Sequence, residues 1–149
     1  MFNPDFILEY QPGYNGIADI YYDISSIHPE WNFLLCRFEY AGIEKGLYVL
    51  LESSFEVEDK NGHSNLSHYS REEKRSLWQA IFGLKEFHLM ATQPDIVEHF
   101  IGDEPGIFFN ERFSLYQQYL NLEGYSYLQP EGKYNSFWLV KDSILQKLH

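Results

Sequence analysis

The stretch SREEKRSLWQAIFGLKEFHLM (residues 70–90) is where the sequence changes from one kind of secondary structure to another. Leu77, Ile81 and Leu84 recur at the spacing of one helical face, and His88 lies on the same stripe. Ser70 followed by Glu73 fits the S-x-x-E capping box, so we expect the helix to begin at Ser70. The stretch therefore predicts a long amphipathic helix over residues 70–90.

Upstream of this helix the chain has the composition of β-strands. Four segments rich in aromatic and aliphatic residues are separated by short turns that contain glycine or proline. The links are too short for parallel crossovers, which need about a dozen residues, so we expect an antiparallel meander over residues 5–58. The four predicted strands are residues 5–10, 17–24, 32–40 and 47–58.

Downstream of it the pattern predicts more helices and a hairpin. Pro94 suits the first turn of a short helix over residues 94–101, and a further amphipathic segment predicts a helix over 110–121. The segments YSYLQ and YNSFWLVK favour a hairpin, followed by a short helix from Asp142. We expect an α+β fold in which all three longer helices pack on one face of the sheet, in a single domain of residues 1–149.

The charge of the chain is concentrated in the predicted sheet. The net charge is −11, from 22 acidic and 11 basic residues. Up to residue 59 there are 11 acidic residues, and only Arg37 and Lys45 oppose them. Such a chain lacks the basic patch that releases counterions from nucleic acid, so we expect no direct nucleic-acid binding. An acidic surface instead favours a basic partner.

Strand alternation places most of these carboxylates on one face. If the apolar sets face the helices, the opposite face gathers eight of them, with Arg37 as the one offsetting charge: Asp5, Glu9, Asp19, Asp23, Glu39, Glu52, Glu56 and Glu58. A solvated polar face is the ordinary alternative for a one-sided antiparallel sheet. Like charges side by side destabilise a sheet, which favours a face that is used.

We therefore predict that this face binds a protein partner. Tyr21 and Phe33, which interleave with the carboxylates, are suitable aromatic anchors. The predicted partner-binding residues are Asp19, Tyr21, Asp23, Glu39, Glu52, Glu56 and Glu58.

Histidines give no comparable indication of catalysis or metal binding. His63 and His68 are five residues apart in a loop-like stretch, not four apart as in a helical zinc motif, so a loop and helix start is the simpler interpretation. His88 is expected to be a hydrogen-bonded core histidine. We predict no catalytic residue, no metal site and no cofactor, and the absence of glycine-rich or nucleophile motifs makes an enzyme the less favoured class.

Cysteine usage and hydropathy predict a cytoplasmic protein. Cys36 is the single cysteine and lies in the apolar run FLLCRF, so a buried, inert thiol is expected. The N-terminal segment has no basic and apolar leader pattern, and no run reaches the ~18 apolar residues of a membrane helix. We expect no membrane association.

This profile of a small, acidic, aromatic-rich chain without an active-site motif resembles that of bacterial toxin-immunity proteins. The resemblance implies a protein of bacterial competition that binds a basic, nuclease-like toxin domain and blocks its active site. The alternative is a small enzyme or ligand-binding domain with an aromatic-lined pocket, to which His88, His68 or Asp103 would contribute chemistry.

Overall fold

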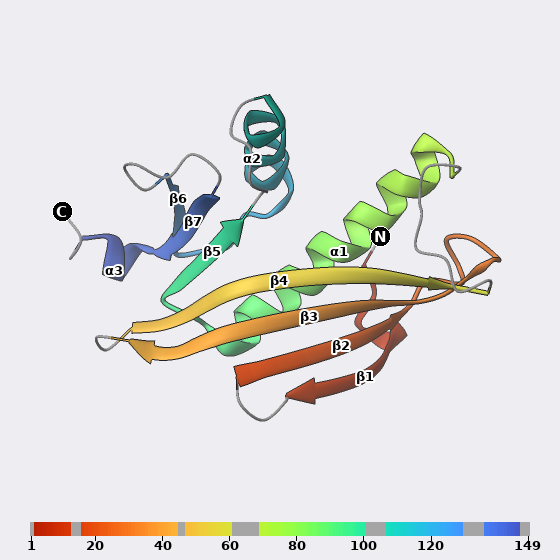
Figure 1. Cartoon of the computed structure of the whole chain (residues 1–149), viewed down its shortest axis with the longest axis horizontal. Helices are drawn as coiled ribbons and strands as arrows, with labels where there is room; N and C mark the ends of the chain where they lie inside the picture. The colour runs from red at the N-terminus through yellow and green to blue at the C-terminus, as the bar shows by residue number, and fades with distance from the viewer. Residues whose placement is uncertain are drawn as a thin grey trace. The chain divides into compact units, whose positions relative to one another are not determined.

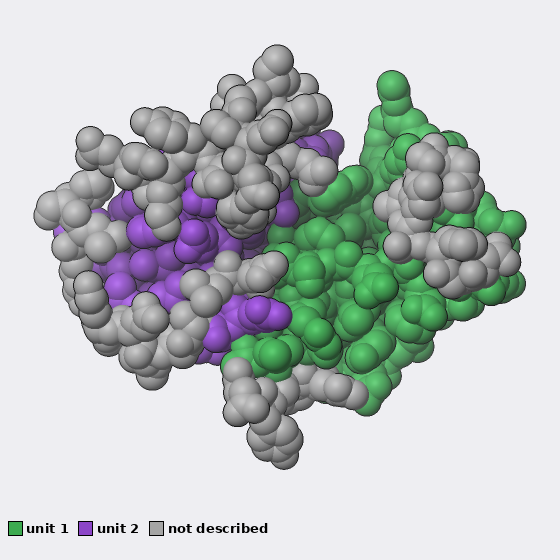
Figure 2. All heavy atoms as spheres, in the orientation of Figure 1, with its two compact units in different colours: residues 1–38, 53–87 green, residues 39–52, 88–149 purple. Residues whose placement is uncertain are grey.

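The structure is a computed structural model that describes residues 2–12, 16–44, 47–60, 69–100, 107–129 and 136–146. It divides into two compact units (Figure 2). Unit 1 comprises residues 1–38 and 53–87, and unit 2 comprises residues 39–52 and 88–149. Each unit therefore combines segments that are distant in the sequence. That residues 1–149 form a single domain stays a prediction.

The fold class is α+β, as predicted, and its elements are labelled in Figure 1. The strand order among the described residues is β1-β2-β3-β4-β5-β7-β6, and most neighbours are antiparallel. The strands are β1 (Ile7–Pro12), β2 (Ile17–Asp23), β3 (Trp31–Glu44), β4 (Leu47–Asp59), β5 (Ile96–Phe100), β6 (Tyr125–Leu128) and β7 (Ser136–Lys141). The helices are α1 (Arg71–Thr92), α2 (Ile107–Tyr119) and α3 (Asp142–Leu145), with a 3-10 turn at Pro4–Phe6.

Unit 1 is a meander of β1, β2 and parts of β3 and β4, covered on one face by α1. Strand alternation places one set of apolar side chains toward the helix, and these are almost fully buried. They are Ala18, Ile20, Tyr22, Leu34, Cys36, Phe38 and Val57. The helix contributes Leu77, Ile81 and Leu84, the predicted stripe, to the same core. The meander and the helix are confirmed, and the apolar set of the strands faces the apolar stripe of the helix, as predicted.

Cys36 is a buried thiol, as expected. Its side chain is fully enclosed in the core of unit 1. Burial raises the pKa of the Cys36 thiol to about 12, because the thiolate would lose its hydration there. The residue is therefore inert at neutral pH.

The predicted alternation fails in the first strand. Asp5 and Phe6 belong to the 3-10 turn, so the strand begins at Ile7. The β1–β2 register then shifts between Ile7 and Glu9, which is a β-bulge, and Leu8 is 61% exposed instead of facing the helix. A bulge adds one residue to a strand and therefore reverses the face on which the later residues of that strand lie.

A close backbone approach anchors the N-terminal segment on α1. Phe2 packs on the rings of Tyr22 and Phe87, and its Cβ lies directly against Gly83 in the middle of the helix. A Cβ at position 83 would overlap Phe2, which explains a glycine inside an otherwise strongly helical stretch.

Unit 2 corrects one predicted helix. Residues 94–101 do not form a helix: Ile96–Phe100 is the strand β5, parallel to β4 and antiparallel to β7. Ile96, Val97 and His99 are buried, so this strand has buried side chains on both of its faces. Such a short apolar run cannot be distinguished from a buried helical turn by periodicity.

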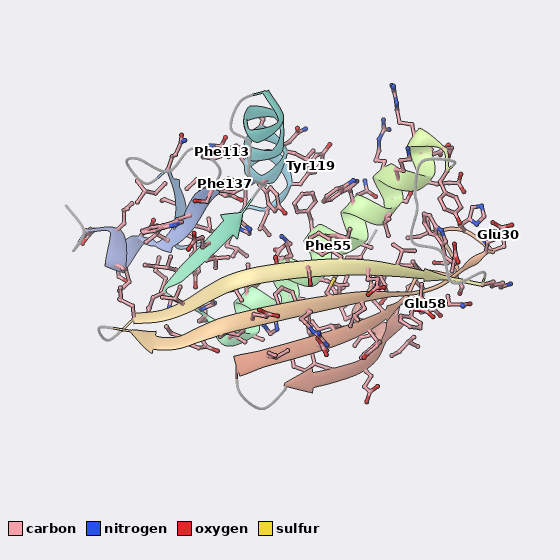
Figure 3. All side chains as sticks on the ribbon, in the orientation of Figure 1. Glu30, Phe55, Glu58, Phe113, Tyr119 and Phe137 are labelled. Carbon is pink, nitrogen blue, oxygen red and sulfur yellow. The ribbon has the colours of Figure 1, made fainter. Side chains whose placement is uncertain are left out.

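The remaining elements of unit 2 agree with the prediction. Helix α2 runs from Ile107 to Tyr119, close to the predicted 110–121. β6 and β7 form the predicted antiparallel hairpin, and α3 begins at Asp142. Phe113 on α2 stacks on Phe137 on β7, with ring centroids 4.5 Å apart (Figure 3).

Candidate functional site

The outer face of unit 1 is the surface of β2–β4 opposite α1, and it holds most of the predicted partner-binding residues. It is defined by the residues that alternate with the buried core set. These are Asp19, Tyr21 and Asp23 on β2, Phe33, Leu35 and Arg37 on β3, and Ser54, Glu56 and Glu58 on β4. All nine are half-buried or exposed.

Two of its carboxylates have structural partners within the chain. Arg37 donates from Nε and Nη2 to the two oxygens of Asp19, at 2.8 and 3.0 Å. Asp23 accepts hydrogen bonds from the backbone N–H and the hydroxyl of Ser25, which lower the pKa of its carboxyl. Asp19 and Asp23 are therefore partly committed to holding β2 and the turn after it.

The other end of the outer face carries carboxylates of a different kind. Glu56 and Glu58 are exposed on β4, and Figure 3 labels Glu58 near the end of this strand. Within the part of the chain that the structure describes, neither has an ion-pair partner. Their charge is available to an approaching molecule.

An aromatic pair lies among these charges. The rings of Tyr21 and Phe33 meet edge to face, with centroids 5.6 Å apart and planes at 63°. Both side chains are half-buried, so part of each ring is presented to solvent. A rigid, partly exposed aromatic pair is typical of the anchors at protein interfaces.

Two predicted residues are not brought to the outer face of unit 1. Glu39 and Glu52 belong to unit 2, where Glu39 is half-buried, and the side chain of Glu52 lies outside the described residues. Strands β3 and β4 are long enough to contribute to both units. Residues on the same face of one strand can therefore belong to different units.

Sequence reasoning missed a cavity of about 400 Å³ beside β4 in unit 1. Its apolar wall comes from Phe55 and Val57 on β4 and from Leu77, Trp78 and Ile81 on α1. Leu35, Arg37, Ser54 and Glu56 of the outer face also line it. Side chains from both faces of β4 thus line one cavity, which places it around the edge of that strand.

The stretch between β4 and α1 contains the two loop histidines. His63 and His68 lie outside the described residues. The predicted capping box is confirmed: the Glu73 N–H donates to Ser70 Oγ at 3.1 Å, and the Ser70 N–H donates to Glu73 Oε1 at 2.9 Å. Hydrogen bonds from the Ser70 backbone N–H and the Ser70 side chain to the Glu73 carboxyl lower the pKa of that carboxyl.

A third histidine supports the start of the same helix. His28 Nδ1 accepts the Glu30 N–H at 3.0 Å, so the proton of the neutral ring lies on Nε2, which is 3.0 Å from Glu73 Oε2. The His28 ring packs against Trp31 and Tyr69. These contacts hold the start of α1 in place, so we assign His28 a structural role.

Removing the cap has a defined expected cost. Ser70→Ala leaves an N–H of the first turn without its acceptor, and we expect a loss of about 1 kcal/mol in the free energy of unfolding. Ser70→Thr, which keeps the hydroxyl, should lose less than about half of that. Urea unfolding of both variants measures the difference, and equal losses would contradict the capping role.

His88 is a core histidine, as expected. It is fully buried in unit 2, its Nε2 lies 2.6 Å from the Tyr40 hydroxyl, and that hydroxyl is 2.9 Å from Thr92 Oγ1. Burial lowers the pKa of His88 to about 4, so the ring is neutral at pH 7. A buried, neutral histidine beside a hydroxyl network is typical of a packing role.

Three further observations do not assign a function to the protein: they concern metal binding, membrane insertion and similarity to known proteins. In the described ranges, no group of three or more His, Cys, Asp and Glu side chains is placed to hold a metal ion. No helix in that part of the chain has the length and apolar character needed to cross a membrane. No family model, curated protein sequence or solved structure matches this chain.

Proposed function

We propose that this protein is an acidic protein-binding inhibitor, of the kind that toxin-immunity proteins represent, and that the outer face of unit 1 binds a basic partner. One observation carries the proposal: a single sheet face holds two exposed carboxylates, Glu56 and Glu58, together with the half-buried aromatic pair of Tyr21 and Phe33. Charges attract and orient the partner, and the rings provide contact area.

Each predicted residue that lies on the outer face of unit 1 has a role under this proposal. Glu56 and Glu58 steer a basic surface and form ion pairs with it, and Tyr21 is the anchor against Phe33. Asp19 and Asp23 keep β2 and Arg37 in place. A nuclease toxin fits this surface, because its active site is basic in order to bind phosphates, and carboxylates can occupy the same groove.

Charge reversal tests the proposal directly. We expect the double change Glu56→Lys and Glu58→Lys to slow association with the captured basic partner by about tenfold or more at low salt, because steering depends on local charge. The partner is first isolated by affinity capture from the native cell at low and high salt. Association rates are then measured by surface plasmon resonance at both ionic strengths.

A matched control separates local from net charge. Glu86→Lys with Glu123→Lys produces the same change in net charge at exposed positions that are not part of the outer face. This control should change the rate by less than about threefold. If both double variants behave alike, the outer face is not the binding surface.

Ligand binding is the second candidate function, and the cavity favours it. Its volume of about 400 Å³ is within the ~300–1,000 Å³ range of small-molecule pockets, and Phe55 and Trp78 give it an aromatic lining. A metabolite or metal that copurifies with the protein and is displaced by Trp78→Ala would favour this function over inhibition.

A further inference from the structure

Among the described residues, no strand pairs with the edge of β4 in unit 1 that faces away from β3. The register between β4 and β5 covers Val49 and Leu50 in the described part of the chain, and it ends there. From Ser53 to Asp59, within the described residues, β4 has β3 on one side and no strand paired on the other. An open edge presents a row of backbone N–H and C=O groups, which is a template for an added strand.

The cavity lies beside this edge and is large enough for a bulky side chain. On the α1 side of β4 its wall includes Phe55, Val57, Trp78 and Ile81. Trp78 is half-buried and meets Phe55 edge to face at 6.1 Å, so an aromatic surface borders the space. A side chain entering from the edge would gain apolar contact without displacing the core.

The two faces of β4 differ in chemistry, and this defines the partner. Glu56 and Glu58 point to the outer face, whereas Phe55 and Val57 point to α1. A strand added beside β4 alternates in the same way, so its side chains lie next to carboxylates on one face and next to the cavity on the other. Basic residues suit the first position and apolar residues the second.

We propose that the β4 edge over residues 53–59 binds an extended segment of a partner protein in which basic and apolar side chains alternate, the apolar ones entering the cavity. This rests on the proposed function, because it assumes a protein partner, and it specifies how that partner is bound. Main-chain hydrogen bonds give affinity in this mode, and the alternating side chains give specificity.

The test uses the whole protein and a synthetic probe. The probe is a short, end-capped, fluorescently labelled peptide in which lysine alternates with valine, and binding is measured by fluorescence anisotropy. We expect saturable binding, at least about tenfold tighter than that of a peptide of the same composition with its lysines grouped. No saturable binding, or equal binding of the two peptides, overturns the proposal.

Methylated peptides test the strand pairing itself. In an extended strand, the N–H groups of alternate residues point to opposite edges, so methylating all the lysine amides or all the valine amides blocks one edge each. One methylated peptide should bind like the parent, and the other should lose affinity at least about tenfold. Equal loss, or no loss, in both would overturn edge pairing.

Two protein variants separate this inference from the proposed function. Trp78→Ala should weaken peptide binding at least about tenfold, with circular dichroism confirming the fold. Tyr21→Ala, on the outer face, should leave it within about twofold while weakening capture of the basic partner. If capture depends on Tyr21 but not on Trp78, the edge inference fails and the proposed function stands. If peptide binding depends on Trp78 but capture does not depend on Tyr21, the reverse holds.

Discussion

Replacing Phe137 with alanine is expected to lower the free energy of unfolding by about 3–5 kcal/mol. Phe137 is fully buried in β7, where its ring stacks on Phe113 at 4.5 Å and meets Tyr116 and Tyr127 at 5.3 and 5.9 Å. Phe137 is the ring that contacts all the others in an aromatic cluster that joins α2, β6 and β7, and the substitution removes it. The loss combines buried apolar area with the cavity left among rings that cannot collapse.

Urea unfolding followed by circular dichroism measures this effect. Tyr119→Ala is the matched control, because Tyr119 is an aromatic residue of the same unit that is 46% exposed, and its loss should stay within about 0.5 kcal/mol. Phe137→Leu, which keeps most of the volume, should cost about 1–1.5 kcal/mol and covers the case in which the alanine variant does not fold. A loss below about 1 kcal/mol for Phe137→Ala would contradict the cluster's central role.

Acidification is expected to destabilise the protein through His88. Its pKa is lowered by burial from 6.5 to about 4, so between these values the unfolded chain binds a proton that the folded chain does not. The contribution to stability is therefore intact above pH 6.5 and is lost as the pH falls toward 4. The shift corresponds to about 3 kcal/mol at most.

His88→Gln isolates this contribution from that of the carboxylates. Glutamine keeps a polar group near the Tyr40 hydroxyl but does not titrate. On going from pH 7 to pH 4, the unaltered protein should lose about 3 kcal/mol more unfolding free energy than the variant. If both lose the same amount, His88 is not held neutral by its surroundings.

Local sequence patterns predicted most of the fold because most of it obeys one-sided amphipathic rules. The core faces of β2, β3 and β4 alternate as expected, and α1 begins at the predicted capping box. The two errors arise where a local rule is interrupted. Leu8 lies at a bulge, and Ile96–Phe100 is a short run whose strand identity depends on neighbours far away in the sequence.

The candidate site was predictable in part for the same reason. Alternation placed Asp19, Tyr21, Asp23, Glu56 and Glu58 on the outer face. It did not reveal that Arg37 and Ser25 already engage two of these carboxylates, since such pairings depend on how neighbouring strands and turns meet. Nor did alternation show that Glu39 and Glu52 belong to the other unit, because a strand pattern carries no information on where compact units divide.

The sequence by itself determined the α+β class, the meander, the long capped helix and the acidic character of one sheet face, because each depends on residues within a few positions of one another. Only the tertiary structure decided that the described register of β4 with β5 ends at Leu50 and that a cavity lies beside the edge of β4 beyond that point. That edge depends on the parallel pairing of strands separated by the whole of α1. Contacts between such distant segments set the place where a partner strand can bind, and no local pattern encodes them.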